Sequence, residues 1–270
     1  MAEGDTIHRL ARQLDRALAG RAIATAAAPA YDSPLRPHPA RLAALEGASF
    51  ESAEARGKHL LLHFEHELVL HCHLGMRGFW RIEGPSPPSR FGTRPSRSAS
   101  SAWIVLSATG VEAAQFGGRL LALRTEDELR GDRRLRALGP DILAEGFRAE
   151  ASVGMLRSVD QSRELGDALL DQTLVAGIGN VYKSEGCHAA RVDPWRPLAA
   201  LDDEELRRVL IEIRALMSRG LVRGREPRGV YRRAGRPCAR CRAPIRSRGQ
   251  GDGNRTTYWC PRCQSPGGAR

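Results

Sequence analysis

The chain has 270 residues, 41% of them hydrophobic, which is room for two ordinary domains with real cores plus a small module. It has no apolar run as long as a membrane span and no basic-then-apolar start of the signal-peptide kind, so we expect a protein of the reducing cytoplasm. The formal net charge of +11 favours a polyanionic partner, either a nucleic acid or an anionic membrane.

The first part of the chain is predicted to be β-rich after one opening helix. Residues 5–19 carry apolar side chains at helical spacing, and Gly20 closes that pattern. Short strand-like stretches follow at 49–55, 59–64, 68–71, 103–107 and 119–124. A Pro/Ser/Arg-rich loop at 84–101 interrupts them. This alternation over about 100 residues predicts a β-sandwich or a barrel.

After residue 124 the pattern becomes helical. Residues 125–130 begin with a capping threonine and acidic side chains, as a helix start does, and 202–217 show the clearest apolar face. We therefore predict an α+β protein. Its parts are a β-sandwich domain with flanking helices, a linker, a helical domain and a C-terminal zinc-ribbon hairpin, at 1–133, 134–148, 149–234 and 235–270.

Four cysteines near the C-terminus form two C-x-x-C pairs, Cys238 with Cys241 and Cys260 with Cys263. The segment between the pairs is polar and turn-rich, and it can form a β-hairpin. Two such pairs can place four thiolates tetrahedrally around one structural Zn²⁺. The alternative is two disulfides, which a reducing compartment disfavours. A hairpin this small cannot bury a core of its own, so the metal is expected to hold it together.

Basic side chains surround this hairpin, and they are almost all arginine. From Arg219 to Arg255 a dozen arginines face only two acidic residues, which favours contact with phosphates over a merely solvated face. Of the 42 basic residues only Lys58 and Lys183 are lysines. An ammonium is a compact charge with a tunable pKa, so each lysine is a candidate for chemistry or phosphate contact, although compositional drift explains them equally well.

The segment 171–185 contains a tight glycine turn between two helical stretches. Gly177 and Gly179 break the pattern, and Asn180 stands where a helix N-cap would stand. Free backbone N–H groups there could bind a phosphate, with Asn180 and Lys183 as further donors. A purely structural helical corner is the equal alternative.

Five motifs, in order, resemble the formamidopyrimidine-DNA glycosylase/endonuclease VIII family. They are A-E-G-D (2–5), R-G-K-H-L-L-L (56–62), H-L-G-M (73–76), G-I-G-N-V-Y-K-S-E (177–185) and Y-W-C-P-R-C-Q (258–264). The resemblance covers nearly the whole chain. It implies a monomeric base-excision-repair enzyme that binds damaged DNA between a β-sandwich and a helix–two-turn–helix domain, localised in the cytoplasm at the nucleoid.

The resemblance also implies roles for individual residues. The amine of Ala2, freed by loss of Met1, would attack C1′ of the damaged nucleotide, with Glu3 moving protons and Lys58 contacting phosphates around the lesion. Asn180 and Arg255 would bind the flanking phosphates. Met76 would fill the gap left by the flipped nucleotide, and Phe116 would wedge against the opposite base; a core position is the alternative for Met76.

The chain departs from the family pattern at several positions. Ala2 replaces the usual proline, and Thr6 replaces a second glutamate. Ala114 and Gln115 precede Phe116 where relatives that act on oxidised purines carry two arginines, which favours oxidised pyrimidines. We therefore expect a bifunctional glycosylase and lyase that cleaves by β- or β,δ-elimination. The alternatives are an abasic-site lyase with weak glycosylase activity and a catalytically weak damaged-DNA-binding protein. His71 and His73 are expected to be structural rather than metal ligands, and Cys72 and Cys187 to be plain buried thiols.

Overall fold

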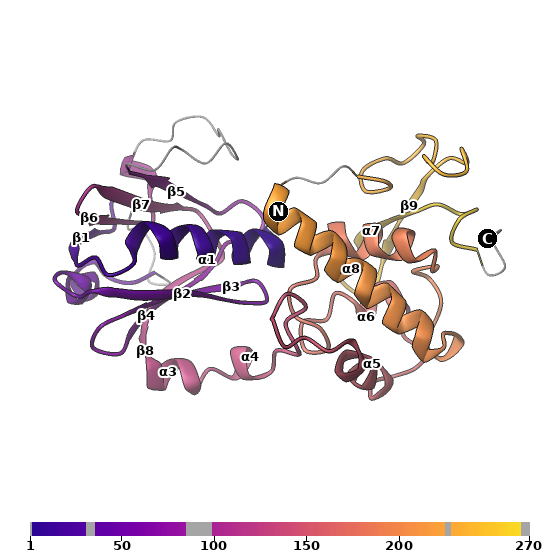
Figure 1. The fold of residues 1–270 in the computed structure, drawn as a ribbon, viewed down its shortest axis with the longest axis horizontal. Helices are drawn as coiled ribbons and strands as arrows, with labels where there is room; N and C mark the ends of the chain where they lie inside the picture. Colours follow the sequence, from indigo (N-terminus) through magenta and orange to yellow (C-terminus); the bar gives the residue numbers. More distant parts are fainter. Residues whose placement is uncertain (1, 31–35, 85–98, 225–227, 266–270) are drawn as a thin grey trace. The chain divides into compact units, whose positions relative to one another are not determined.

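The computed structural model describes residues 2–30, 36–84, 99–224 and 228–265 (Figure 1). They form two compact units, Met1–Arg136 and Ala137–Arg270. The helical segment and the cysteine hairpin therefore belong to one unit. Among the described helices, none is both long and apolar enough to cross a membrane.

Unit 1 is built on two four-stranded antiparallel sheets. One has the strand order β1-β6-β7-β5 and the other β2-β3-β4-β8. Their bounds are Ile23–Ala27 (β1), Phe50–Arg56 (β2), His59–Phe64 (β3), Leu68–His73 (β4), Phe79–Glu83 (β5), Ile104–Ala108 (β6), Val111–Phe116 (β7) and Leu120–Thr125 (β8). The helices α1 (Gly4–Leu18), α2 (Pro39–Leu42), α3 (Glu126–Arg130) and α4 (Arg133–Arg136) flank them, with short 3-10 turns at Ala43–Leu45 (η1) and Ala99–Ser101 (η2).

Helix α1 lies against both sheets and supplies much of the core of unit 1 (Figure 1). Its apolar face, with Ile7, Leu14 and Leu18 fully buried, packs mainly on β2 and β3. Gly20, at φ +67°, ends the helix in the left-handed conformation that glycine tolerates. The chain thus leaves α1 already turned toward β1, and residues 2 and 3 stand at the start of this buried helix.

Unit 2 contains α5 (Ala149–Arg157), α6 (Leu165–Ala168), α7 (Asn180–Ala190), η3 (Leu198–Ala200), α8 (Asp203–Arg223) and the hairpin β9 (Arg246–Gln250) and β10 (Arg255–Trp259). Helix α8 begins with a reciprocal capping box between Asp202 and Glu205. Helix α7 packs along α8 on one side and touches β10 on another. Because α7 lies between these elements, almost all of its side chains are buried.

The structure differs from the expected elements in two places. Strands β1, β5 and β7 were not foreseen. Residues 134–148, expected to be a linker, are partly built into unit 2: Ile142 is fully buried in its core, and the backbone N–H of Gly139 donates to the carbonyl of Gln172. The loop expected at 84–101 falls largely outside the described residues.

Candidate functional site

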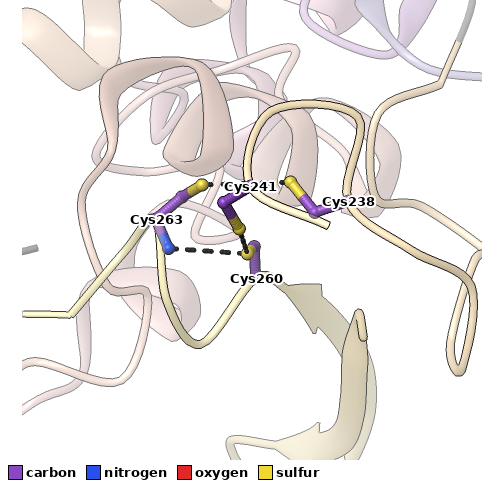
Figure 2. Close-up of side chains that lie close together, drawn as sticks. All are labelled: Cys238, Cys241, Cys260 and Cys263. Atoms are coloured by element: carbon purple, nitrogen blue, oxygen red, sulfur yellow. Dashed lines mark hydrogen bonds between the residues drawn. The ribbon is translucent and has the colours of Figure 1, made fainter. Parts of the chain in front are cut away.

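The four cysteines predicted as metal ligands converge in unit 2 (Figure 2). Their sulfur atoms all lie within 4.8 Å of one another. The distance from Cys238 Sγ to Cys263 Sγ is 3.9 Å, and that from Cys241 Sγ to Cys260 Sγ is 3.4 Å. Four Zn–S bonds of about 2.3 Å at tetrahedral angles place sulfur atoms about 3.8 Å apart, so the cluster has the size of a zinc site. None of the four forms a disulfide, and the alternative pairing is wrong.

Neighbouring groups hold these ligands in place. The backbone N–H of Cys260 donates to Oε1 of Gln264, whose amide nitrogen donates to the carbonyl of Val192. On the other side, His188 of α7 brings its Nε2 to 3.6 Å from Cys238 Sγ. Burial, with the nearby arginines, lowers the pKa of His188 to about 4, so its ring is neutral and can donate one N–H. Such supporting contacts orient metal ligands.

The hairpin β9–β10 presents an arginine-bearing surface beside this metal site. Arg246, Arg248 and Arg255 are all exposed. The guanidinium of Arg248 lies 3.9 Å from the ring centroid of Trp195, which in turn packs edge-on against Trp259. An arginine stacked in this way keeps its donors directed outward for an anion.

The glycine turn before α7 brings Asn180 to the same hairpin. Gly177 takes φ +97°, and Gly179, not Asn180, is the N-cap; Asn180 is the first residue of the helix. The sequence placed the cap one residue too late. The amide nitrogen of Asn180 donates to the carbonyl of Thr256, at 2.8 Å. Thr256 follows Arg255 directly, so the two residues expected to bind phosphate lie on adjoining segments of unit 2.

Two residues expected to touch DNA are buried in the structure. Lys183 is fully buried, and its Nζ donates to Thr257 Oγ1 at 2.6 Å. Phe116 is also fully buried and stacks on Phe79 with ring centroids 5.1 Å apart. Both side chains are thus enclosed in this structure, and their contact with DNA stays a prediction. Both sit on elements enclosed by neighbours, a condition that the local sequence does not show.

The predicted catalytic residues all lie in unit 1. Glu3 is the N-cap of α1 and is only 2% exposed, while Ala2 before it is half-buried against the core. Lys58 is half-buried in the turn between β2 and β3. Met76 follows β4 and is 56% exposed, which rules out the alternative of a core methionine.

Sequence reasoning missed a cluster of three histidines next to Lys58. The Nδ1 of His59 lies 2.8 Å from Nε2 of His71, and the rings of His59 and His73 meet edge-on at 4.9 Å between centroids. Burial is the first cause that lowers the pKa of each ring, to about 3 for His59 and about 4 for His71. The positive charge of Lys58 contributes to the lowered pKa of His73. Adjacent strands supply the three rings, a proximity that only the register of β3 and β4 reveals.

The three histidines are not among the groups of side chains that the structure brings together as a possible metal site. In the part of the chain that the structure describes, the cysteine quartet is the only group of three or more such side chains that could hold an ion. The structural role expected for His71 and His73 is consistent with their burial between strands. The pKa of Cys72 is raised above its usual range by burial, and that of Cys187 to about 12, so both thiols are inert.

Comparisons with known proteins cover the whole chain. Residues 1–109 match the formamidopyrimidine-DNA glycosylase N-terminal domain, 138–229 the formamidopyrimidine-DNA glycosylase H2TH domain, and 235–266 the zinc finger found in FPG and IleRS. A probable endonuclease 8 2 of Streptomyces coelicolor is 38% identical, covering 99% of this chain and 97% of its own. A formamidopyrimidine-DNA glycosylase of Thermus thermophilus is 35% identical over 82% of this chain and 85% of its own.

Solved structures agree on the fold. The Lactococcus lactis Fpg in complex with an abasic site containing DNA superposes with a TM-score of 0.82, at 22% identity, covering 98% of this chain and 100% of that one. Together with the cysteine geometry, these matches define a bifunctional DNA glycosylase and abasic-site lyase of base excision repair, with one zinc ion in its C-terminal finger. The chain belongs to the formamidopyrimidine-DNA glycosylase/endonuclease VIII family.

Proposed function

We propose that this enzyme removes oxidised bases, with pyrimidines preferred, and cleaves the resulting abasic site through a Schiff base on the amine of Ala2. The observation that carries the proposal is the buried carboxyl of Glu3, which directly follows Ala2 at the amino end of α1. A nucleophile and an acid–base group thus stand next to each other in one half-enclosed position.

The amine of Ala2 suits this reaction once Met1 is removed. An α-amine has an ordinary pKa of about 7.7–8.0, so a useful fraction is neutral near pH 7. The amino end of α1 carries partial positive charge, which disfavours a second positive charge beside it and favours the neutral amine. Lys58 is the rival nucleophile, but an ordinary lysine has a pKa of about 10.4 and is almost fully protonated at pH 7.

In the proposed reaction, Ala2 is the nucleophile and Glu3 moves the protons. The amine nitrogen bonds to C1′ while the bond from C1′ to the base breaks, and the departing base takes up a proton that the attacking amine releases. Glu3 donates a proton to the ring oxygen of the sugar as the ring opens to the protonated imine. Loss of a proton from C2′ then expels the 3′ phosphate, which is β-elimination, and loss of a proton from C4′ expels the 5′ phosphate, which is δ-elimination. Glu3 is proposed to move these protons because it directly follows the nucleophilic residue in the chain.

Damaged DNA is the proposed substrate, and basic and amide groups in both units would hold its backbone. Lys58 in unit 1 and Asn180 and Arg255 in unit 2 are proposed to contact phosphates on either side of the lesion, which position the duplex without reading its sequence. Met76, exposed and unbranched, is proposed to fill the space of the flipped nucleotide. The Lactococcus lactis Fpg structures hold abasic-site and Fapy-dG DNA, which supports a damaged duplex as the ligand class.

The preference for oxidised pyrimidines rests on β7. Ala114 and Gln115 are fully buried there, so no cationic side chain at these positions reaches a base opposite the lesion. The relative at 38% identity carries the name endonuclease 8, which accords with this preference, and a formamidopyrimidine-DNA glycosylase follows at 35%.

A second candidate is an abasic-site lyase with weak glycosylase activity. Ala2 favours it, because a primary amine forms an imine that must be protonated before it can accept electrons, whereas the secondary amine of proline gives a permanently charged iminium. Comparing single-turnover rates on a base lesion and on a preformed abasic site separates the two candidates.

Borohydride trapping tests the proposed mechanism. The wild-type protein should become covalently attached to abasic-site DNA, and peptide mapping should place the adduct on the N-terminal peptide. Retaining Met1 or adding an N-terminal tag, each with Ala2 unchanged, should abolish trapping but not DNA binding. Lys58→Ala, the matched control, should still be trapped. An adduct on Lys58, or an unchanged lyase rate with a blocked terminus, would overturn the mechanism.

A further inference from the structure

A chain of buried polar groups joins α7 to the zinc hairpin. It begins at Lys183, which is fully buried and whose Nζ donates to Oγ1 of Thr257 on β10, at 2.6 Å. Thr257 is itself fully buried and donates to Oε1 of Gln250 on β9, also at 2.6 Å. Because an ammonium has only donors, the hydroxyl of Thr257 must accept from it and give its own hydrogen to Gln250.

The same chain continues to the segment before α6. Gln250 is 4% exposed, and its amide nitrogen donates to Oε2 of Glu164 at 2.9 Å and to the carbonyl of Pro194 at 2.8 Å. Each donor therefore meets an acceptor in a single direction, from Lys183 through Thr257 and Gln250 to the carboxylate of Glu164. Lys183, Thr257 and Gln250 are buried and Glu164 is half-buried; we call these four residues the buried relay.

Close packing leaves no room for the hairpin to shift at its turn. A Cβ on Gly166 of α6 would lie 2.3 Å from Oε1 of Gln250. A Cβ on Gly251 would lie 2.0 Å from Oδ1 of Asp167, and Gly251 also has φ +64°. Backbone and side chains thus touch directly between α6 and the β9–β10 turn.

The groups proposed to bind phosphate lie next to this relay. Asn180 precedes Lys183 by about one turn of α7, and its amide donates to the carbonyl of Thr256. Arg255 is exposed and comes two residues before Thr257 on β10, so the two side chains leave the same face of the strand. The position of β10 along α7 consequently decides where Arg255 stands relative to Asn180.

Burying the ammonium of Lys183 between α7 and β10 costs free energy, which indicates that this residue has a role in aligning the two elements. Removing a charged group from water costs free energy, and losing one of its buried hydrogen-bond partners costs more. A slip of β10 by one residue would turn the side chain of Thr257 to the other face of the strand and break its hydrogen bond with Lys183. A polar group buried in this manner raises the free energy of every register of β10 along α7 except the one that gives it its partner.

We propose that the buried relay is a positioning device that fixes the register of β10 against α7, so that Asn180 and Arg255 act as one preformed phosphate site. Lys183, Thr257 and Gln250 are positioning residues in this scheme and do not touch DNA. The inference rests on the proposed phosphate contacts of Asn180 and Arg255, and it assigns Lys183 a function that its burial permits.

The matched pair Thr257→Val and Thr257→Ser tests the proposal in the zinc-loaded full chain. Valine keeps the shape and removes the hydroxyl, whereas serine keeps the hydroxyl. We expect Thr257→Val to raise the Kd for a duplex with a stable abasic-site analogue about tenfold, the loss of one charge-assisted contact. The slope of log K against log salt should flatten by about one. Thr257→Ser should bind as the wild type does, and the zinc content of both should be unchanged.

A double-mutant comparison separates positioning from a general loss of stability. If the relay acts through Arg255, Arg255→Ala should weaken binding in the wild type but add little to Thr257→Val, whereas Lys58→Ala should weaken binding by the same factor in both. Equal effects of Arg255→Ala in the two backgrounds, with a wild-type Kd for Thr257→Val, would overturn the proposal. If Arg255→Ala and Asn180→Ala both leave the wild-type Kd unchanged, the proposed phosphate contacts fail instead.

Hydrogen exchange tests the structural part without DNA. Amides of 246–250 and 255–259 should exchange at least about tenfold faster in Thr257→Val than in Thr257→Ser, because local opening of the hairpin becomes easier. Lys183→Met, which removes the charge at similar length, should do the same. Unchanged protection of the hairpin in both variants would refute the relay whatever the DNA result.

Discussion

The histidine cluster of unit 1 gives single residues a measurable effect on stability. Burial lowers the pKa of His71 to about 4, with the charge of Arg124 adding to it, and lowers that of His59 to about 3. The unfolded chain has histidine pKa values of about 6.5. At pH values between the folded-state and the unfolded-state pKa, the unfolded state binds more protons than the folded state. The free energy of unfolding therefore falls as the pH falls through this window.

We therefore expect unit 1 to be fully stable above about pH 6.5 and to lose stability down to about pH 4. The buried ring of His71 alone contributes a slope of about 1.4 kcal/mol per pH unit in that window. Urea unfolding at several pH values, followed by Trp fluorescence, measures it. His71→Gln should flatten the slope, whereas His66→Asn, an exposed control in the β3–β4 turn at φ +64°, should not. A slope that survives His71→Gln would contradict this origin.

Arg255 carries a prediction at the same scale. Its guanidinium is exposed at the start of β10, so Arg255→Ala should weaken DNA binding about equally for all lesions. The salt slope of log K should flatten by about one unit. Arg41→Ala removes the same charge from α2 and is the control for net charge. A mutant that changes lesion preference while keeping its salt slope would argue against a phosphate contact.

At the scale of elements, the spacing of apolar residues correctly located the helices and strands that bury one face and expose the other. Helices α1 and α8 and strands β2, β3, β4, β6 and β8 follow from apolar spacing and start signals such as Thr125, whose capping box the structure confirms. Strand β1 was missed because alanine and threonine dominate it, β7 because it mixes Val, Glu, Ala, Gln and Phe without alternation, and β5 because it is half-buried along most of its length. Such strands exist because neighbouring strands pair with them, which is tertiary context and not local propensity.

Helix α7 marks the limit of pattern reasoning. It is buried on nearly every side, between α8 and β10, so it has no polar face from which to infer the place of Lys183. The helical pattern after the glycine turn predicted the helix, and only the fold shows where its lysine points. The helix is closely packed at Gly186, because a Cβ there would lie 2.0 Å from Cγ1 of Ile213.

Gly186→Ala should therefore destabilise unit 2 even though alanine favours helices. Overpacking of this kind costs about 1–3 kcal/mol, more than the roughly 1 kcal/mol that replacing glycine gains in a helix. Gly154→Ala in α5 is the matched control, since nothing lies within 4 Å of its new Cβ, and it should be neutral or stabilising. Urea unfolding compares the two. Adding Ile213→Ala to Gly186→Ala should cost less than the sum of the single changes.

At the scale of the whole molecule, the sequence predicted the chemistry of the metal site more completely than that of the catalytic site. Thiolate spacing alone defines a zinc site, because the ligand set and the hairpin between its halves are local. The three histidines and the buried relay join residues far apart in the chain, such as His59 with His71 and Lys183 with Thr257. Spacing cannot encode such contacts, because the register of strands and the packing of helices create them.

The metal site also predicts how the two units respond when zinc is lost. The finger's own buried cluster consists of little more than Val230, Ile245 and the cysteines, so its folding depends on metal binding, worth of order 10 kcal/mol in isolated fingers. Unit 1 has a separate, much larger apolar core around α1 and should stay folded. Chelation or Cys260→Ser should therefore abolish tight DNA binding, because Arg255 loses its support, while unit 1 keeps its amide protection from hydrogen exchange.

Atomic absorption measures the zinc content of the protein, and a binding assay with abasic-site DNA measures its affinity. Cys72→Ser, a buried thiol of unit 1 outside the metal site, is the control and should keep its zinc. Full DNA affinity in a protein shown to be free of zinc would contradict the dependence of the DNA-binding surface on its metal.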